Sequence, residues 1–222
     1  MLLDATLIYH QTWFRLNSMR LGLVADLHGD IRALETTLRR LEELAVDQVI
    51  CLGDLIGYGS EPDAVVTAIR DRAVSCIRGN HDRWALEKRQ MIGLRGWKIA
   101  ALRDDTWDFL QALPGSLRLE VDGEAIEFHH GSPTGDTEAV TAYKPLPPSV
   151  EEFWSRSDAR VLVLGHTHSP MIERGPRGTV INPGSVLGVT GIHTSYTFAV
   201  LDASNLSVRI HEVRTGREIR RD

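Results

Sequence analysis

The stretch LGLVADLHGDIRALETTLRRLEELAVDQVICLGD, residues 21–54, decides the fold of this 222-residue chain. LGLVA and QVICL are apolar runs of strand length, and each leads into an aspartate, Asp26 and Asp54 respectively. Between them, Asp30 is placed to cap a helix whose apolar residues recur at spacings of three and four. The order strand, helix, strand predicts a right-handed βαβ unit, with polar side chains gathered at the carboxyl edge of the sheet.

Three further segments bring metal-ligating side chains to strand ends. The run AVSCI leads into Gly79-Asn80-His81-Asp82, RVLVL leads into Gly165-His166-Thr167-His168, and the alternating run EAIEF ends in His129-His130. Each motif alone is weak, because short combinations of Asp, His and Gly arise by chance. All five together have one simple explanation, a fold that gathers them into a binuclear metal centre. Strand alternation points His129 and His130 in opposite directions, so one of them faces that centre.

The remaining chain predicts more strands than helices. Ser60 is the expected cap of a second helix with Pro62 in its first turn. A helical stretch is expected from Asn80 to about residue 113, with breaks near Gly93 and Gly96. Asp122-Gly123 suits a tight hairpin turn. Further expected elements are a loop over 132–148, a helix near 149–157, and strands over 48–52, 74–77, 160–164, 170–174, 179–181, 194–201 and 206–213. A chain that starts as βαβ and finishes as antiparallel β predicts two sheets packed face to face with helices outside.

Composition bounds the class of protein. The length fits one domain, which we predict over residues 19–222, with residues 1–18 as an N-terminal extension of unknown role. A formal charge of −5 argues against an extended nucleic-acid surface. No apolar run is long enough for a bilayer and residues 1–18 lack a secretory pattern, so no membrane partner is expected. Cys51 and Cys76 lie in expected strands and suit a reducing cytoplasm.

The ordered set Asp26-Leu27-His28, Gly53-Asp54, Gly79-Asn80-His81-Asp82, His130 and Gly165-His166-Thr167-His168 resembles the signature of the calcineurin-like metallophosphoesterase superfamily. That signature runs DxH, GD, GNH(D/E), H and GHxH. The stretches GDLIGYG, RGNHD, HHGSP, GHTHSP and NPGS also resemble a small bacterial subgroup of these proteins. The resemblance covers the chain from Met19 onward and implies an α/β fold, a four-layer αββα sandwich of two mixed sheets flanked by helices.

The resemblance also implies the ligand sets. The first metal would take Asp26, His28, Asp54 and His168, and the second would take Asp54, Asn80, His130 and His166, with Asp54 as the bridge. The family places its ligand directly before glycine, which selects His130 over His129. Mixed imidazole and oxygen ligation favours two divalent transition-metal ions, manganese first, with iron, nickel, cobalt or zinc as alternatives.

These ligands imply hydrolysis of a phosphoester by in-line attack of a hydroxide that bridges the two ions. His81, beside the ligand Asn80, is the candidate proton donor to the leaving oxygen, and Asp82 either orients His81 or caps the following helix. Tyr58, Arg83 and Arg95 are candidate substrate contacts. Asn182-Pro183-Gly184-Ser185 resembles a recurring family turn, for which we expect a structural role.

The substrate class stays open between several alternatives. Phosphoprotein phosphatases of this superfamily carry GDxxDRG, and here Gly57 and Tyr58 replace the second Asp and the Arg, which weakens that reading. We expect a phosphodiesterase acting on small phosphodiesters or nucleotides. The alternatives are a phosphomonoesterase, including one that hydrolyses dinucleoside polyphosphates, and a non-catalytic scaffold of the same fold.

Overall fold

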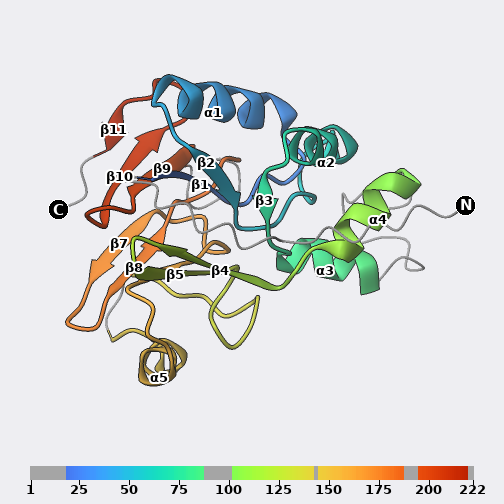
Figure 1. Ribbon diagram of the computed structural model, residues 1–222. Helices are drawn as coiled ribbons and strands as arrows, with labels where there is room; N and C mark the ends of the chain where they lie inside the picture. The colour runs from blue at the N-terminus through green and yellow to red at the C-terminus, as the bar shows by residue number, and fades with distance from the viewer. Residues whose placement is uncertain (1–18, 88–101, 143–144, 188–194, 220–222) are drawn as a thin grey trace, which may run out of the picture.

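The computed structural model describes residues 19–87, 102–142, 145–187 and 195–219, and within these ranges the strands form two stacked sheets (Figure 1). Sheet A has the spatial order β11-β10-β9-β1-β2-β3, with bounds β1 Arg20–Val24, β2 Gln48–Cys51, β3 Ser75–Cys76, β9 Thr197–Asp202, β10 Ser207–Glu212 and β11 Glu218–Ile219. Sheet B has the order β4-β5-β6-β8-β7, with bounds β4 Ser116–Val121, β5 Glu124–His129, β6 Val161–Val163, β7 Met171–Arg174 and β8 Thr179–Asn182.

Both sheets are mixed. In sheet A, β1, β2 and β3 are parallel, whereas β9 runs antiparallel to β1 and β10. In sheet B, β5, β6 and β8 are parallel, and β4 and β7 pair antiparallel at its two edges. The parallel pairing of β1 with β2, with Val24 opposite Cys51, confirms the predicted strand-helix-strand start.

Alternation along the strands creates three apolar layers. Leu21 and Leu23 of β1 face the space between the sheets, where they share a core with Phe128 of β5. Val24 faces the other way, against helices α1 Ile31–Glu43 and α2 Pro62–Asp71, which cover sheet A. Helix α5 Pro148–Arg156 covers the outer face of sheet B through Phe153 (Figure 1). This order of helix, sheet, sheet, helix confirms the predicted αββα sandwich.

The helix starts agree with the sequence in one case and differ in the other. Asp30 caps α1 as predicted, because its Oδ1 accepts a hydrogen bond of 2.9 Å from Ala33 N. Glu61, not Ser60, is the N-cap of α2, and it makes no side-chain cap bond. Pro62 needs no backbone partner at the first helical position, so this start forms without a side-chain acceptor.

The middle of the chain contains two helices and a hairpin. Helices α3 Asn80–Glu87 and α4 Asp104–Ala112 lie beside the sheets (Figure 1), within the stretch predicted as helical. The predicted breaks at Gly93 and Gly96 lie outside the described residues. The hairpin of β4 and β5 turns at Asp122 and Gly123, with φ of 52° and 85°, as the Asp-Gly pair predicts.

The end of the chain needs two corrections. β9 begins at Thr197 rather than residue 194, and β11, which the sequence did not predict, adds a two-residue edge to β10. No helix among the described residues is long and apolar enough to cross a membrane.

Candidate metal centre

Five loops that follow β1, β2, β3, β5 and β6 meet where the two sheets adjoin. The side chains that sequence analysis assigned to metal all lie there, and none is more than partly exposed: Asp26, His28, Asp54, Asn80, His130, His166 and His168. Three overlapping groups of ligand atoms lie within 4.8 Å of one another, namely Asp26 with His28 and His168, His28 with Asp54 and His81, and Asp26 with Asp54 and His130.

One half of the centre joins β1 to the loop after β6. His28 Nε2 lies 3.0 Å from His168 Nε2, and Asp26 Oδ1 lies 3.5 Å from His168 Nε2. Asp54 Oδ2 is 3.7 Å from His28 Nε2. Ligands about 2.0–2.2 Å from one ion are separated by roughly 3–4 Å, so these four side chains fit one cation.

The other half shares Asp54. His130 Nε2 lies 3.4 Å from Asp54 Oδ2 and 2.9 Å from Asn80 Oδ1. His166 Nδ1 is also 2.9 Å from Asn80 Oδ1. These distances fit a second cation, with the Asp54 carboxylate between the two positions.

The hydrogen-bonding state of these side chains fits a metal. His28 Nδ1 donates to Ile56 O and His130 Nδ1 donates to Leu52 O, so in the neutral rings both Nε2 lone pairs point into the centre. There the Nε2 of His130 faces acceptor oxygens of Asn80 and Asp54. Asp26 Oδ2 is buried without a hydrogen-bond partner. Converging acceptors and an orphaned buried carboxylate oxygen are what divalent cations would satisfy.

Charge in the centre is unevenly distributed. Burial lowers the pKa of His28 to about 3 and of His168 to about 4, so both are neutral at pH 7. Burial also acts to lower the pKa of His130, but the Asp54 carboxylate outweighs it and raises that pKa to about 10. Burial raises the pKa of Asp26 well above its ordinary value. Without metal, His130 therefore carries a positive charge between buried carboxylates.

The backbone is strained at five of the seven candidate ligands. They have φ in the left-handed region, at 56° for Asp26, 46° for His28, 55° for Asp54, 67° for His166 and 56° for His168. Non-glycine residues adopt such angles only where their surroundings impose them, at a cost of roughly 1–3 kcal/mol each. Strain concentrated on the converging residues supports a functional role for this cluster.

Asp82 holds the loops of sheet A together. Its carboxylate accepts hydrogen bonds of 2.9 Å from Asp54 N and Gly79 N and of 3.0 Å from Leu55 N, with a longer one of 3.3 Å from Ile56 N. The bond to Gly79 N caps the start of α3, one of the two roles the sequence left open. A Cβ at Gly79 would lie 2.2 Å from Asp54 Oδ1, so only glycine permits this approach of the two loops.

Two residues of the NPGS turn support the centre more directly than the sequence indicated. Asn182 Nδ2 donates to Gly165 O at 2.6 Å and to Thr167 Oγ1 at 3.1 Å, which fixes the loop bearing His166 and His168. Ser185 Oγ donates to Asp26 O at 2.9 Å. The turn was recognisable from its sequence, but these partners were not.

His81 and Tyr58 border the centre. His81 Nε2 lies 4.0 Å from Asp54 Oδ2, and the His81 ring contacts His28 and Tyr58 with centroids 4.7 and 5.0 Å apart. Burial lowers the pKa of His81. Tyr58 is 55% exposed. Gly57 lies against both rings, since a Cβ there would be 2.6 Å from His28 Nδ1 and 2.9 Å from His81 Nδ1.

Arg83, the other predicted substrate contact, points at carboxylates. Its Nε and Nη2 lie 2.6 and 2.9 Å from the two oxygens of Asp136, and its Nη1 lies 2.7 Å from Glu87 Oε1. Asp136 lies in the loop after His130, and its pairing with Arg83 was not predicted from the sequence. The third predicted contact, Arg95, lies outside the described residues.

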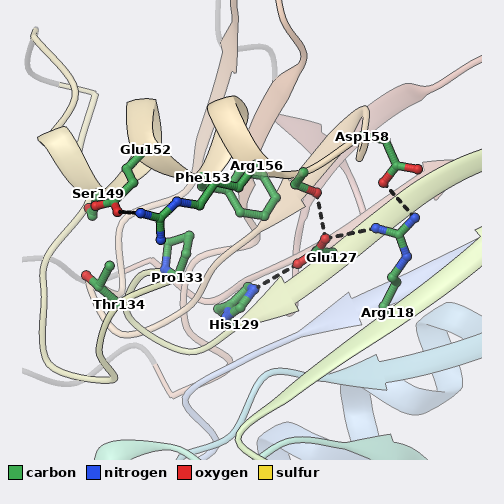
Figure 2. A pocket seen from close by; sticks show the side chains of 11 residues that line it. Arg118, Glu127, His129, Pro133, Thr134, Ser149, Glu152, Phe153, Arg156 and Asp158 are labelled. Carbon is green, nitrogen blue, oxygen red and sulfur yellow. Dashed lines mark hydrogen bonds and ion pairs between the residues drawn. The ribbon is translucent and has the colours of Figure 1, made fainter.

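His129 turns away from the centre, as strand alternation predicts. Figure 2 shows it in a pocket between β5 and α5, where its Nε2 lies 3.3 Å from Glu127 Oε2. Glu127 also accepts from Ser157 Oγ and Arg118 Nη1 (Figure 2). The two adjacent histidines therefore occupy opposite faces of sheet B, and His130 is the one that meets Asp54.

The chain belongs to the calcineurin-like phosphoesterase superfamily, whose domain model matches residues 19–206. A probable metallophosphoesterase of Methanothermobacter thermautotrophicus is 25% identical over 202 residues, which is 89% of this chain and 94% of that protein. The superfamily membership makes a phosphoesterase the class that fold and site define, and it implies divalent metal ions.

Solved structures share the fold. The hypothetical protein PH1004 from Pyrococcus horikoshii OT3 superposes with a TM-score of 0.76 at 21% identity, covering 87% of each chain. A metallophosphoesterase from Sphaerobacter thermophilus gives 0.70 at 22% identity, covering 89% of each chain. More distant neighbours include a putative diadenosine tetraphosphatase, at 0.62 and 18%, and a novel archaeal phosphodiesterase, at 0.55 and 20%.

Proposed function

We propose that this protein is a binuclear metal-dependent phosphodiesterase that hydrolyses small phosphodiesters or nucleotides. The observation that carries the proposal is the convergence of donor atoms on one oxygen of Asp54, since Oδ2 lies 3.4 Å from His130 Nε2 and 3.7 Å from His28 Nε2. A carboxylate oxygen that faces an imidazole of each ligand set suits a bridge between two cations.

The residues divide into two ligand sets. Asp26, His28 and His168 would hold the first ion and Asn80, His130 and His166 the second, with Asp54 common to both. Ions held there, with manganese as the first candidate and iron, nickel, cobalt or zinc as alternatives, would supply Lewis-acid activation of water and of the phosphoryl oxygens. The left-handed backbone, together with the hydrogen bonds of the buried side chains Asp82 and Asn182, keeps the donor atoms in place before substrate arrives.

We assign His81 the transfer of a proton from Nε2 to the leaving oxygen. Its Nε2 lies 4.0 Å from Asp54 Oδ2, and its side chain is 9% exposed, so it borders the region where the phosphoryl group would bind. Burial disfavours the charged ring, while the Asp54 carboxylate and the phosphoryl group of a bound substrate favour it. Asp82 acts on this step only through the loops that it holds.

Tyr58 is the proposed substrate contact. Its exposed ring lies 4.7 Å from the His28 ring, at the mouth of the centre. Tyr58 stands where the phosphoprotein phosphatases have an arginine that holds phosphate, and it has no positive charge to do the same. Its aromatic ring suits stacking on a nucleobase instead. This favours nucleotides, and it also keeps a dinucleoside polyphosphate hydrolase as the second candidate, an activity named for one of the structural neighbours.

Elemental analysis and a substrate panel test the proposal together. We expect two equivalents of a divalent transition metal in protein supplied with Mn²⁺ or Ni²⁺, and faster hydrolysis of phosphodiesters than of monoesters. Higher rates on monoesters or dinucleoside polyphosphates would select the second candidate. Protein that binds metal but turns over no phosphoester would refute catalysis, and protein that binds none would favour a scaffold.

A further inference from the structure

The segment from Gly131 to Thr137 directly follows His130, which belongs to the second ligand set. A Cβ at Gly131 would lie 2.6 Å from the carbonyl carbon of Asp136, so the segment packs directly against the main chain that follows His130. Asn80 Oδ1, at the start of α3, lies 2.9 Å from both His130 Nε2 and His166 Nδ1. The separation of this segment from α3 therefore bears on His130 directly and on His166 through Asn80.

One side chain ties this segment to the third ligand of the set. Arg83 lies on α3, three residues after Asn80, and both Asp136 oxygens accept from its guanidinium at 2.6 and 2.9 Å. The pair is partly buried, with side-chain exposures of 32% and 26%. A bidentate, partly shielded pair differs from ordinary surface ion pairs, which contribute little. It is also the contact through which α3 and the loop after β5 are held at a fixed separation.

The geometry points to Arg83 and Asp136 as a pair of positioning residues, which we call the clamp, that hold Asn80, His130 and His166 at the spacing needed for the second metal. The clamp rests on the proposed function and gives Arg83 a role different from substrate contact. Residues that orient metal ligands typically change metal affinity by about 10-fold to 100-fold when they are replaced. A substrate contact would leave metal affinity unchanged.

The test measures Mn²⁺ binding to metal-free protein by titration calorimetry. The variants are Arg83→Gln, Asp136→Asn and the double variant, with Arg83→Lys as a conservative replacement that keeps the charge but cannot form the fork. Arg70→Gln is the matched control. Arg70 Nη1 lies 2.8 Å from Asp105 Oδ2, and this ion pair joins α2 to α4 rather than two loops of the centre. Thermal unfolding without metal checks that every variant folds.

We expect each single variant to weaken the second of two Mn²⁺ equivalents by about 10-fold and to leave the first unchanged. The double variant should be no weaker than the worse single variant, since both break one interaction. Arg83→Lys should fall between wild type and Arg83→Gln, and Arg70→Gln should match wild type.

The Asp136→Asn variant distinguishes the clamp from a substrate contact, because only the clamp requires Asp136. Unchanged metal affinity in both single variants would overturn the clamp. A raised KM in Arg83→Gln with a silent Asp136→Asn would identify a substrate contact instead. Wild-type protein that binds no Mn²⁺ would overturn the proposed function itself, whereas two ions bound with the same affinities in wild type and all variants would overturn only the clamp.

Discussion

The two sheets contribute different chemistry to the centre. Loops of sheet A bring both carboxylates and the amide, from Asp26, Asp54 and Asn80, whereas loops of sheet B bring only imidazoles, from His130, His166 and His168. Negative charge is therefore concentrated on one side. Cations would therefore be attracted mainly by the carboxylates on the sheet A side.

The two sides are also held in different ways. In sheet A, one buried carboxylate, Asp82, accepts from four backbone amides across two loops. In sheet B, one neutral amide, Asn182, donates to the carbonyl of Gly165 and the hydroxyl of Thr167. Burial raises the pKa of Asp82 to about 7, so its carboxylate is charged above that pH. Hydrogen bonds to a charged group are stronger than those between neutral groups, so above pH 7 the sheet A loops are the more firmly fixed.

Removing the shared charge should have the largest effect. Asp54→Asn keeps the size of the side chain but removes the charge that both ligand sets share, so we expect kcat/KM on the best phosphodiester to fall about 1,000-fold, roughly 4 kcal/mol of barrier. Bound metal should fall below two equivalents. His129→Asn, on the opposite face of the same sheet as His130, is the control, and activity retained in Asp54→Asn would refute the bridge.

Loss of the sheet A brace should come next. Asp82→Ala leaves the amides of Asp54, Leu55, Ile56 and Gly79 without their acceptor, and buried donors without partners cost about 1–3 kcal/mol each. Counting only the three bonds of 2.9–3.0 Å at the low end of that range, we expect the free energy of unfolding to fall by about 3 kcal/mol in urea titrations. Asp71→Ala on the exposed face of α2 should change it by less than about 0.5 kcal/mol. Equal stability of the two variants would remove Asp82 from this role.

The convergence of the candidate ligands was predictable from sequence because strand ends mark them. Asp26 and Asp54 follow short apolar runs, and residue type at a strand end is a local property that a single chain displays. The family resemblance then assigned His130 over His129, which the structure places on opposite faces of β5. The sandwich followed from the same pattern of strands.

Supporting contacts were not predictable because they join loops far apart in sequence. Asp136 and Arg83 are 53 positions apart, and nothing periodic links them. Ser60 was a good capping residue by type, but Glu61 occupies the cap because Pro62 sets the first helical position. The strand Glu218–Ile219 is too short to show alternation and exists only through pairing with β10.

The sheet B brace should matter less than Asp82. Asn182→Ala removes two donated hydrogen bonds and an accepted one from Gly184 N, and we expect a loss of about 2 kcal/mol in the free energy of unfolding. Asn205→Ala, in an exposed turn where the side chain accepts from Ser207 N, is the control. A loss in Asn182→Ala larger than that in Asp82→Ala would reverse the order proposed for the two sheets.

The smallest expected effect is the pH dependence of metal binding, which comes from a proton on His130. Because Asp54 raises the pKa of His130 to about 10, the metal-free ring is protonated at pH 8, and a metal ion must displace that proton to reach the Nε2 lone pair. Metal affinity should therefore weaken about tenfold, or 1.4 kcal/mol, as pH falls from 9 to 8.

Calorimetry in Tris and in HEPES at pH 8 measures this proton directly, since the two buffers take up protons with different enthalpies. We expect about one proton released as the second ion binds. His130→Gln should abolish the release, while His166→Gln should retain it, because burial lowers the pKa of His166 and leaves that ring neutral. The same binding enthalpy in both buffers would mean that no proton is released. The His130 ring of sheet B would then not be protonated beside the carboxylates of sheet A before metal binds.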